Sequence, residues 1–152
     1  MKAKSLNSKK TQNLKPKCVR DIKNLVCHCS ATAKNTPIEA IKKYWRENLG
    51  WRFFGYHRII KSNGEIVQLA PDEAITNGVA KHNSNSLHVC YIGGKTTDDR
   101  TPAQKAAMER VLREWLAKYP KARIIGHRDF PGVKKACPQF SAEKEYGYLY
   151  TA

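Results

Sequence analysis

Runs of apolar and β-branched residues along the chain predict five short β-strands. They cover residues 25–28, 53–60, 65–69, 87–92 and 123–126. The second and third strands flank Asn63-Gly64, a dipeptide typical of a tight hairpin turn. Residues 71–86 are polar and rich in turn-forming residues, so we expect a long surface loop there.

Two stretches have apolar residues at helical spacing and therefore predict helices. The first should start at Thr36, a capping hydroxyl followed by Pro37, with Glu39 completing a capping box. It should end at Gly50. The second should run from Pro102 to about Tyr119, and a short final helix is predicted over residues 142–150. The apolar positions of the first helix are Ile38, Ile41, Trp45 and Leu49.

The order of these elements, β-α-β-β-β-α-β, predicts one α/β domain with a central mixed β-sheet flanked by helices. A chain of 152 residues with 41% hydrophobic content is long enough to bury one core. We assign residues 23–152 to this domain and residues 1–22 to a basic, flexible N-terminal arm.

The chain is strongly basic, with a formal net charge of +15. Residues 1–23 contribute +7 of this charge, which favours weak binding of poly-anions through the arm. No apolar run has the length of a membrane span, and no apolar segment follows the basic N-terminus as in a secretory signal. We therefore expect synthesis in the cytoplasm without a signal peptide.

The candidate chemistry lies after the last strand, where His127 and Cys137 stand on a segment interrupted by Pro131 and Pro138. An imidazole and a thiol on such a loop suit zinc, but two ligands do not complete a zinc site. A third must come from elsewhere. His28 is the best candidate because it ends a core strand, although spacing alone does not choose among His28, His57, His82 and His88. The odd number of cysteines, five, argues against a disulfide framework.

Several motifs in order resemble the zinc-dependent N-acetylmuramoyl-L-alanine amidases of the phage-lysozyme and peptidoglycan-recognition-protein superfamily (amidase type 2). They are His28 with Ser30-Ala31-Thr32, Gly55-Tyr56-His57, Asn85-Ser86-Leu87, Gly93-Gly94, Thr101-Pro102-Ala103-Gln104, Gly126-His127-Arg128-Asp129 and Lys135-Ala136-Cys137-Pro138. The resemblance spans about residues 24–140. It implies one zinc ion per chain on His28, His127 and Cys137, and catalytic roles for Tyr56 and Lys135.

The sequence also departs from the family pattern. These amidases often carry a His in the loop before the Asn-Ser pair, whereas residues 77–81 here contain none, and His82 follows only later. The family's Cys-Pro-Gly-Phe-Asp pattern reads Cys137-Pro138-Gln139-Phe140-Ser141. We interpret the missing Asp as the loss of a local structural contact.

The resemblance implies a monomeric hydrolase that cleaves the amide bond between N-acetylmuramic acid and L-alanine in bacterial peptidoglycan. Without a signal peptide, the simplest role is that of a phage or prophage endolysin that acts on the cell wall after release. Two alternatives remain at this point. One is a peptidoglycan-binding module without activity, and the other is a basic protein that binds nucleic acid or a polymerase.

Overall fold

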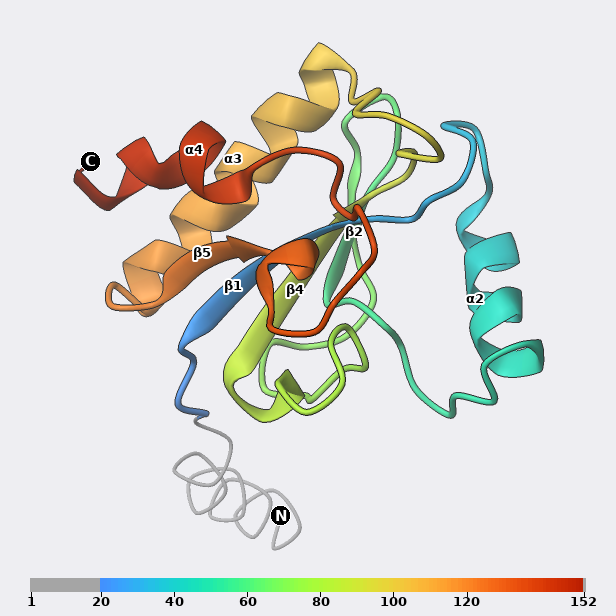
Figure 1. Cartoon of the computed structure of the whole chain (residues 1–152), viewed down its shortest axis with the longest axis horizontal. Helices are drawn as coiled ribbons and strands as arrows, with labels where there is room; N and C mark the ends of the chain where they lie inside the picture. Colours follow the sequence, from blue (N-terminus) through green and yellow to red (C-terminus); the bar gives the residue numbers. More distant parts are fainter. Residues whose placement is uncertain (1–19, 152) are drawn as a thin grey trace, which may run out of the picture.

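The computed structural model describes residues 20–151, which form a five-stranded sheet with helices packed on it (Figure 1). The sheet order is β3-β2-β4-β1-β5; β3 is antiparallel to β2, and the other neighbours are parallel. This mixed sheet in a single α/β domain confirms the predicted fold class. The strands are β1 (Asn24–Cys29), β2 (Arg58–Ile60), β3 (Ile66–Gln68), β4 (Ser86–Tyr91) and β5 (Arg123–Gly126), and the helices are α2 (Ile38–Glu47), α3 (Pro102–Lys118) and α4 (Ala142–Tyr146).

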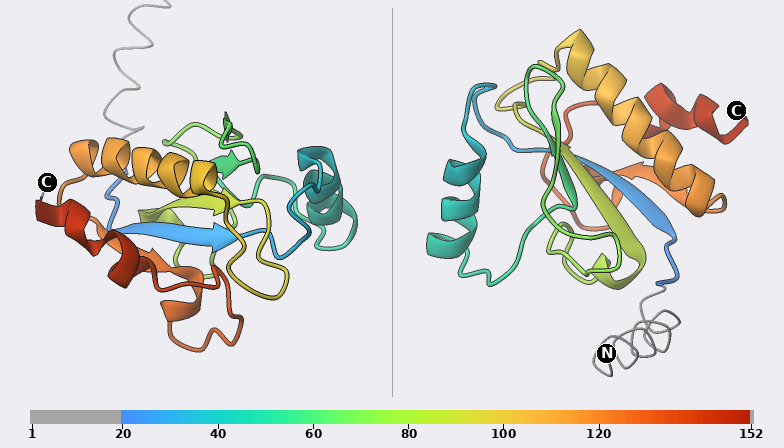
Figure 2. Two further views of the ribbon diagram at one scale, coloured as in Figure 1. Left: turned by 90° about the horizontal axis from the view of Figure 1, so that it is seen from above. Right: turned by 180° about the vertical axis from the view of Figure 1, so that it is seen from behind.

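One face of the sheet is covered by α3, which lies across the strands (Figure 2). Leu25 and Cys27 of β1 point to this face and share a buried cluster with Leu112 and Trp115 of α3. Tyr146 of α4 belongs to the same cluster. Because successive side chains of a strand point to opposite faces, Val26 and His28 must point the other way.

The opposite face carries the long loop and α2. Val26 packs there with Val79 of the loop and Phe130 beyond β5. Ile41 and Trp45 of α2 belong to a further cluster that also contains residues of β2 and β4. His28 therefore lies on the sheet face that is covered by loops and by α2.

The two predicted longer helices begin at or directly after a proline, as expected, but only one of them has the expected type of cap. Thr101 accepts a hydrogen bond from the Gln104 amide, and the Gln104 side chain accepts one from the Thr101 amide. The capping box predicted at Thr36 is wrong: α2 starts at Ile38, its N-cap is Pro37, and no side chain caps it. Thr36 precedes the N-cap residue, so its hydroxyl is one position too early to cap the first turn. None of the helices in residues 20–151 is long and apolar enough to cross a membrane.

Two predicted strands are shorter than expected, whereas β5 has the predicted bounds. Of residues 53–60 only Arg58–Ile60 pairs in the sheet, and of residues 65–69 only Ile66–Gln68. The Phe54 carbonyl instead accepts the Asn77 amide of the long loop. Within this segment only the His57 amide still bonds to a sheet strand, through the His88 carbonyl of β4, and the Phe54 and Tyr56 rings pack in the cluster around α2. The loop predicted at 71–86 is present up to residue 85, with one short turn of 3-10 helix at Asn83–Asn85, and Ser86 already belongs to β4.

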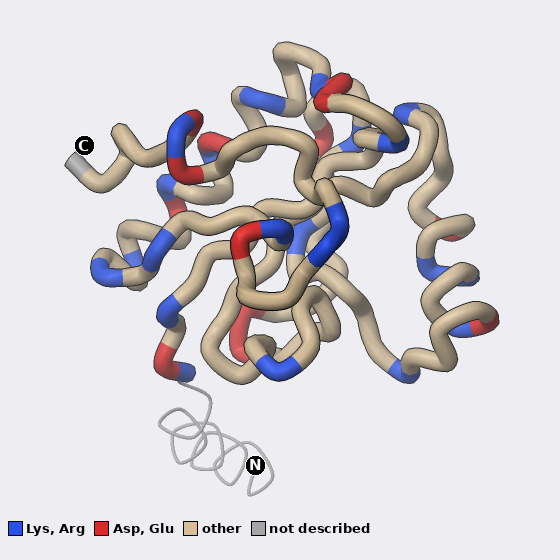
Figure 3. Tube along the Cα trace, viewed as in Figure 1, with Lys and Arg blue, Asp and Glu red and all other residues tan. Residues whose placement is uncertain are grey.

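Residues 20–22 of the predicted N-terminal arm lie within the described part of the chain. Most of the basic arm predicted over residues 1–22 lies outside them. Within them, Arg20 donates to the carbonyl oxygens of Asp72 (2.8 Å) and Ser86 (3.2 Å), and Ile22 is buried. Lys and Arg are interspersed with Asp and Glu over the helices and loops (Figure 3).

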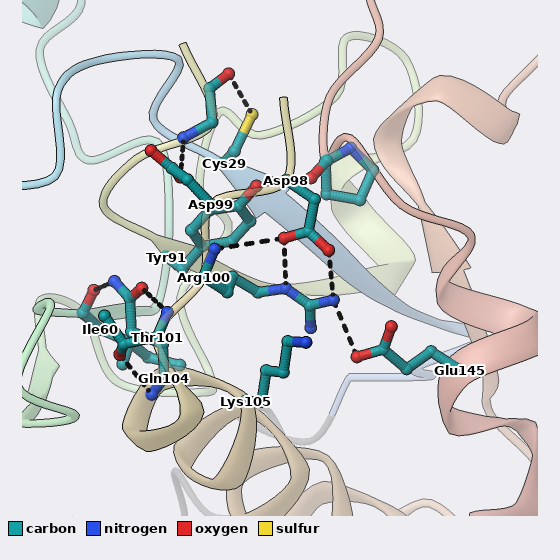
Figure 4. A network of polar contacts seen from close by, with 12 residues as sticks. Cys29, Ile60, Tyr91, Asp98, Asp99, Arg100, Thr101, Gln104, Lys105 and Glu145 are labelled. Atoms are coloured by element: carbon teal, nitrogen blue, oxygen red, sulfur yellow. Dashed lines mark hydrogen bonds and ion pairs between the residues drawn. The ribbon is translucent and has the colours of Figure 1, made fainter. Parts of the chain in front are cut away.

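A buried ion-pair network braces the loop that follows β4 (Figure 4). The Arg100 guanidinium pairs with Asp98 at 2.9 Å and with Glu145 of α4 at 2.8 Å, which compensates the cost of burying its charge. Next to it, Asp99 accepts the Gly94 amide at 2.8 Å, and the Gly94 carbonyl faces the Cys29 thiol at 3.7 Å. The network therefore ties α4 to the end of β1, directly after His28.

Candidate metal centre

Two of the predicted site residues lie side by side at the carboxyl ends of neighbouring strands. β1 and β5 are parallel neighbours, and the last residues paired between them are Cys27 and Gly126. The next residues are His28, which is buried, and His127, which opens a 3-10 turn over His127–Asp129. Because carboxyl ends of parallel strands meet at the same edge, the two imidazoles face each other, with ring centroids 4.9 Å apart.

The loop after β5 returns Cys137 to the same edge. Its carbonyl accepts the Arg128 amide at 2.8 Å, which closes the loop over residues 128–137. The Cys137 Sγ lies 3.2 Å from the Cys29 amide and 3.9 Å from the His28 Nδ1. The Cys137-Pro138 peptide bond is cis.

The ligand atoms of His28, His127 and Cys137 all lie within 4.8 Å of one another. Ligand atoms on a tetrahedral zinc ion are about 3–4 Å apart, given bonds of about 2.0–2.3 Å, so small side-chain movements suffice to bind an ion. Two imidazoles and one thiolate are a donor set that zinc prefers. Three protein ligands leave a fourth position open, which is the pattern of catalytic rather than structural zinc. The residues present therefore fit the metal that the sequence predicts.

The surroundings of these side chains keep both imidazoles neutral and able to bind a metal. Burial lowers the pKa of His28 well below its usual value, and the neighbouring His88 and His127 add to the effect. Burial also lowers the pKa of His127 to about 4, with a smaller contribution from Lys135. Hydrogen bonding with Cys29 and burial raise the pKa of the Cys137 thiol. A bound divalent cation would reverse this last shift, because a coordinating thiol is deprotonated.

Tyr56 lies against the metal-ligand cluster. Its ring centroid is 4.9 Å from that of His28 and 5.4 Å from that of Trp45. Burial raises the pKa of its phenol well above the usual value, so the hydroxyl stays protonated at neutral pH. The ring of its neighbour His57 instead stacks on His88, with centroids 5.8 Å apart, and meets Trp115 of α3 edge-on at 6.4 Å.

A cavity of about 870 Å³ opens over the ligands. Its polar end is formed by His127, Cys137, Tyr56 and Lys135, so all of the predicted catalytic residues share one space. Lys135 is exposed to solvent and lies close enough to His127 to influence its pKa. Aromatic side chains of α2 and the following turn, namely Tyr44, Trp45 and Trp51, form the apolar walls.

The other histidines do not join the metal-ligand cluster. His57 is held by the Ala74 carbonyl at 2.8 Å, and His82 packs on Phe130, outside the residues that line the cavity. The sequence assigned His88 no role, but its Nδ1 lies 2.9 Å from the His28 Nε2. Strand pairing explains its place: His88 is in register with Val26, so its side chain lies on the same face as that of His28.

Comparison with known proteins now decides the family. The model of the N-acetylmuramoyl-L-alanine amidase family matches residues 19–140. The chain belongs to this family. It is therefore a hydrolase that cleaves the amide bond between N-acetylmuramic acid and L-alanine in peptidoglycan, as the sequence predicted.

Curated relatives of this amidase include phage endolysins. It is 35% identical over 123 residues to the endolysin of Enterobacteria phage K11 and 37% identical over 127 residues to that of Enterobacteria phage T3. Each match covers 77% of this chain and 80% of the relative. The predicted endolysin function is thereby confirmed.

Solved structures share the fold at lower identity. The endolysin of Thermus scotoductus bacteriophage Ph2119 superimposes with a TM-score of 0.72 at 20% identity, covering 87% of this chain and 86% of that one. A point mutant of Drosophila PGRP-LB in complex with tracheal cytotoxin gives a TM-score of 0.70 at 18% identity, covering 84% and 80%. These likenesses show that this chain shares its fold with both proteins.

The altered Cys-Pro-Gly-Phe-Asp pattern has visible structural counterparts at two positions of this amidase. Gln139, at the position of the family's Gly, has a positive φ of 76° and donates to the Gly94 carbonyl at 3.2 Å. Ser141, at the position of the family's Asp, caps α4 by accepting the Lys144 amide. Serine and aspartate are both favoured N-cap residues, so Ser141 can cap this helix in place of an Asp.

Proposed function

We propose that this amidase is a zinc enzyme that binds one ion per chain through His28, His127 and Cys137. The observation that carries the proposal is the convergence of these ligand atoms within 4.8 Å, at the polar end of a cavity that Tyr56 and Lys135 also line. Neutral imidazoles and a thiol on rigid strand ends form a preorganised donor set with an open position.

Zinc, when bound, supplies Lewis acidity, which activates water near neutral pH and polarises an amide carbonyl. The Lys135 ammonium stabilises the negative charge that develops on the carbonyl oxygen of the scissile amide. The Tyr56 phenol, kept protonated by burial, donates a hydrogen bond to the tetrahedral intermediate or relays a proton. These two groups stand at the same end of the cavity as His127.

The cavity suits a glycopeptide better than a small molecule. Aromatic rings of Tyr44, Trp45 and Trp51 offer faces for apolar and sugar surfaces, while Ser30 and Asn77 offer hydrogen-bonding groups. The enzyme acts on peptidoglycan of the cell wall after its release from the cytoplasm, where it is made. It works as a monomer.

A second part of the proposal concerns the chain outside the cavity. We assign residues 23–152 to the catalytic domain and residues 1–22 to a basic arm that binds poly-anions weakly. Residues 1–19 hold six of the 28 Lys and Arg and none of the 13 Asp and Glu. Such a segment attracts acidic wall polymers through screened, salt-sensitive interactions.

The decisive experiment is digestion of purified peptidoglycan with and without a chelator. We expect new L-alanine amino termini, no new reducing sugar ends, loss of activity on chelation and recovery with added zinc. A protein that binds the polymer without releasing either product would be a binding module. Undiminished cleavage after complete removal of metal would contradict the zinc assignment.

A further inference from the structure

The two ring nitrogens of His28 face different partners. The Nδ1 faces the Cys137 Sγ at 3.9 Å, on the side of the metal-ligand cluster. The Nε2 lies 2.9 Å from the Nδ1 of His88, and both rings are buried. A neutral imidazole carries its proton on one nitrogen only, so the contact with His88 decides whether Nδ1 has a free lone pair.

The direction of this hydrogen bond is set farther from the cluster. The His88 Nε2 lies 2.9 Å from the Asn83 Oδ1, and the Val79 amide donates to the same oxygen at 2.8 Å. Rotating the Asn83 amide by 180° would turn its NH₂ toward the Val79 N–H, donor against donor, so the oxygen must occupy this place. His88 therefore donates from Nε2 to Asn83, which leaves its Nδ1 as an acceptor. His28 must then donate from Nε2 and keep the lone pair on Nδ1.

We propose that His88 and Asn83 are positioning residues that hold His28 in the Nε2–H tautomer and so direct its Nδ1 lone pair at the metal. The chain of hydrogen bonds starts at the Val79 amide, passes through Asn83 and His88, and ends at the metal ligand His28. This proposal rests on the proposed assignment of zinc to His28, His127 and Cys137. Partners that fix the tautomer of a metal-binding histidine raise metal affinity and orient the ring.

Gly78 makes room for this arrangement. A Cβ at this position would lie 2.3 Å from the His88 Nδ1, a distance that no side chain tolerates. Gly78 belongs to the loop in which the family often carries a histidine. In this chain the loop lacks that side chain, and an imidazole from β4 fills the adjoining space instead.

His88 does not serve as a metal ligand in this arrangement, because both of its nitrogens are engaged. One accepts from His28 and the other donates to Asn83. Its ring is fully buried beneath His28, and it is absent from the residues that line the cavity. Its effect on the metal must therefore pass through His28.

The tautomer can be measured directly on the metal-free full chain. Long-range ¹H–¹⁵N spectra of the histidine rings distinguish a proton on Nδ1 from one on Nε2. We expect the Nε2–H form for His28 in the wild type and a mixture of both forms in His88→Leu. An Nδ1–H tautomer of His28 in the wild type would overturn the proposal without any variant.

Zinc affinity, measured by competition with a chelator, supplies the second readout. His88→Leu should raise the zinc dissociation constant about 10–100-fold, the usual effect of removing such a partner. His88→Asn retains an acceptor near the position of Nδ1 and should recover most of that loss. His82→Leu, a change of the same type outside the site, should have no effect. Equal affinities for the Leu and Asn variants would show that His88 only fills space.

The failure of this inference is distinguishable from failure of the zinc assignment. If Cys137→Ser abolishes zinc binding but His88→Leu binds zinc like the wild type, only the role of His88 is wrong. If Cys137→Ser retains full zinc affinity, the zinc assignment is wrong. Thermal unfolding of each metal-free variant identifies one that does not fold, and Asn83→Leu then replaces His88→Leu, with the same expected shift of the His28 tautomer.

Discussion

His28 and His127 leave adjacent parallel strands one residue beyond their last paired positions, which brings their rings to a centroid distance of 4.9 Å. Neither residue depends on a flexible loop for its position, since His28 lies within β1, where it pairs with Cys90 of β4, and His127 directly follows β5. The third ligand, Cys137, is carried by a loop that is fastened to the same turn through the Arg128 amide. The sheet thus fixes two ligands, and a closed loop adds the third.

Replacement of Cys137 by serine should abolish tight zinc binding and activity, because a neutral hydroxyl replaces the thiolate and the remaining two imidazoles bind zinc weakly. It should also lower the thermal stability of the zinc-loaded protein, since metal affinity favours the folded state. Metal analysis and thermal unfolding test this. Cys27→Ala is the control: it lies on the opposite face of β1, so it should cost stability but keep one zinc.

Lys135→Ala should keep zinc and fold but lower kcat about 10²–10³-fold, the usual effect of removing one group that stabilises the developing oxyanion. Lys134 is exposed and does not line the cavity, so Lys134→Ala should leave kcat nearly unchanged. Steady-state kinetics on a soluble muramyl peptide compare the two. If the variants exchange these phenotypes, the assignment within the loop is wrong by one residue.

The stability of the metal-free protein should fall as pH decreases from 7 to 5, in part because of His57. Burial lowers the pKa of His57 to about 4, from its ordinary 6.5 in the unfolded chain. Between these values the unfolded state binds more protons, so stability is lost as pH falls, by about 2 kcal/mol for this group at pH 5. Urea unfolding at both pH values measures the change. A His57→Gln variant should show a smaller loss, and an equal loss would exclude His57 as a cause.

Gln139→Gly should be more stable than Gln139→Ala by about 1 kcal/mol. Both variants lose the hydrogen bond to the Gly94 carbonyl, but only glycine relieves the positive φ of 76°. Urea unfolding of the two variants tests the order. The same pair of substitutions at Lys144, an exposed position in α4, should give the opposite order, because glycine is unfavourable in a helix. If the Gly and Ala variants have the same order of stability at both positions, backbone strain at Gln139 is not the cause.

Local patterns predicted most of the fold. Apolar runs located all five strands, and β5 agrees with its prediction residue for residue. The errors occur where tertiary contacts override the local pattern. Residues 53–57 have the composition of a strand, but the Phe54 carbonyl accepts a hydrogen bond from Asn77 of the long loop. The rings of Phe54 and Tyr56 pack against Trp45 of α2. The predicted cap at Thr36 is wrong because the local pattern locates the start of a helix only to within about one residue.

The candidate site was only partly accessible from local sequence. The spacing and the two prolines pointed to His127 and Cys137, but the choice of His28 came from resemblance, since it lies 99 residues from His127. The contact between His28 and His88 depends on the register of β1 against β4. That register is a non-local property, and neither motifs nor periodicity report it.

Lysis of whole cells should fall steeply with added salt, whereas cleavage of a small soluble muramyl peptide should fall much less. The net charge of +15 attracts the enzyme to an envelope rich in phosphate and carboxylate, and this attraction is screened beyond about 8 Å at physiological ionic strength. Groups inside the cavity act at shorter range and are screened less. Deleting residues 1–19, which carry six lysines and no acidic residue, should mimic high salt on cells and leave the small substrate unaffected. Equal salt slopes for the two substrates would mean that the charge acts at the active site or serves another partner, such as nucleic acid.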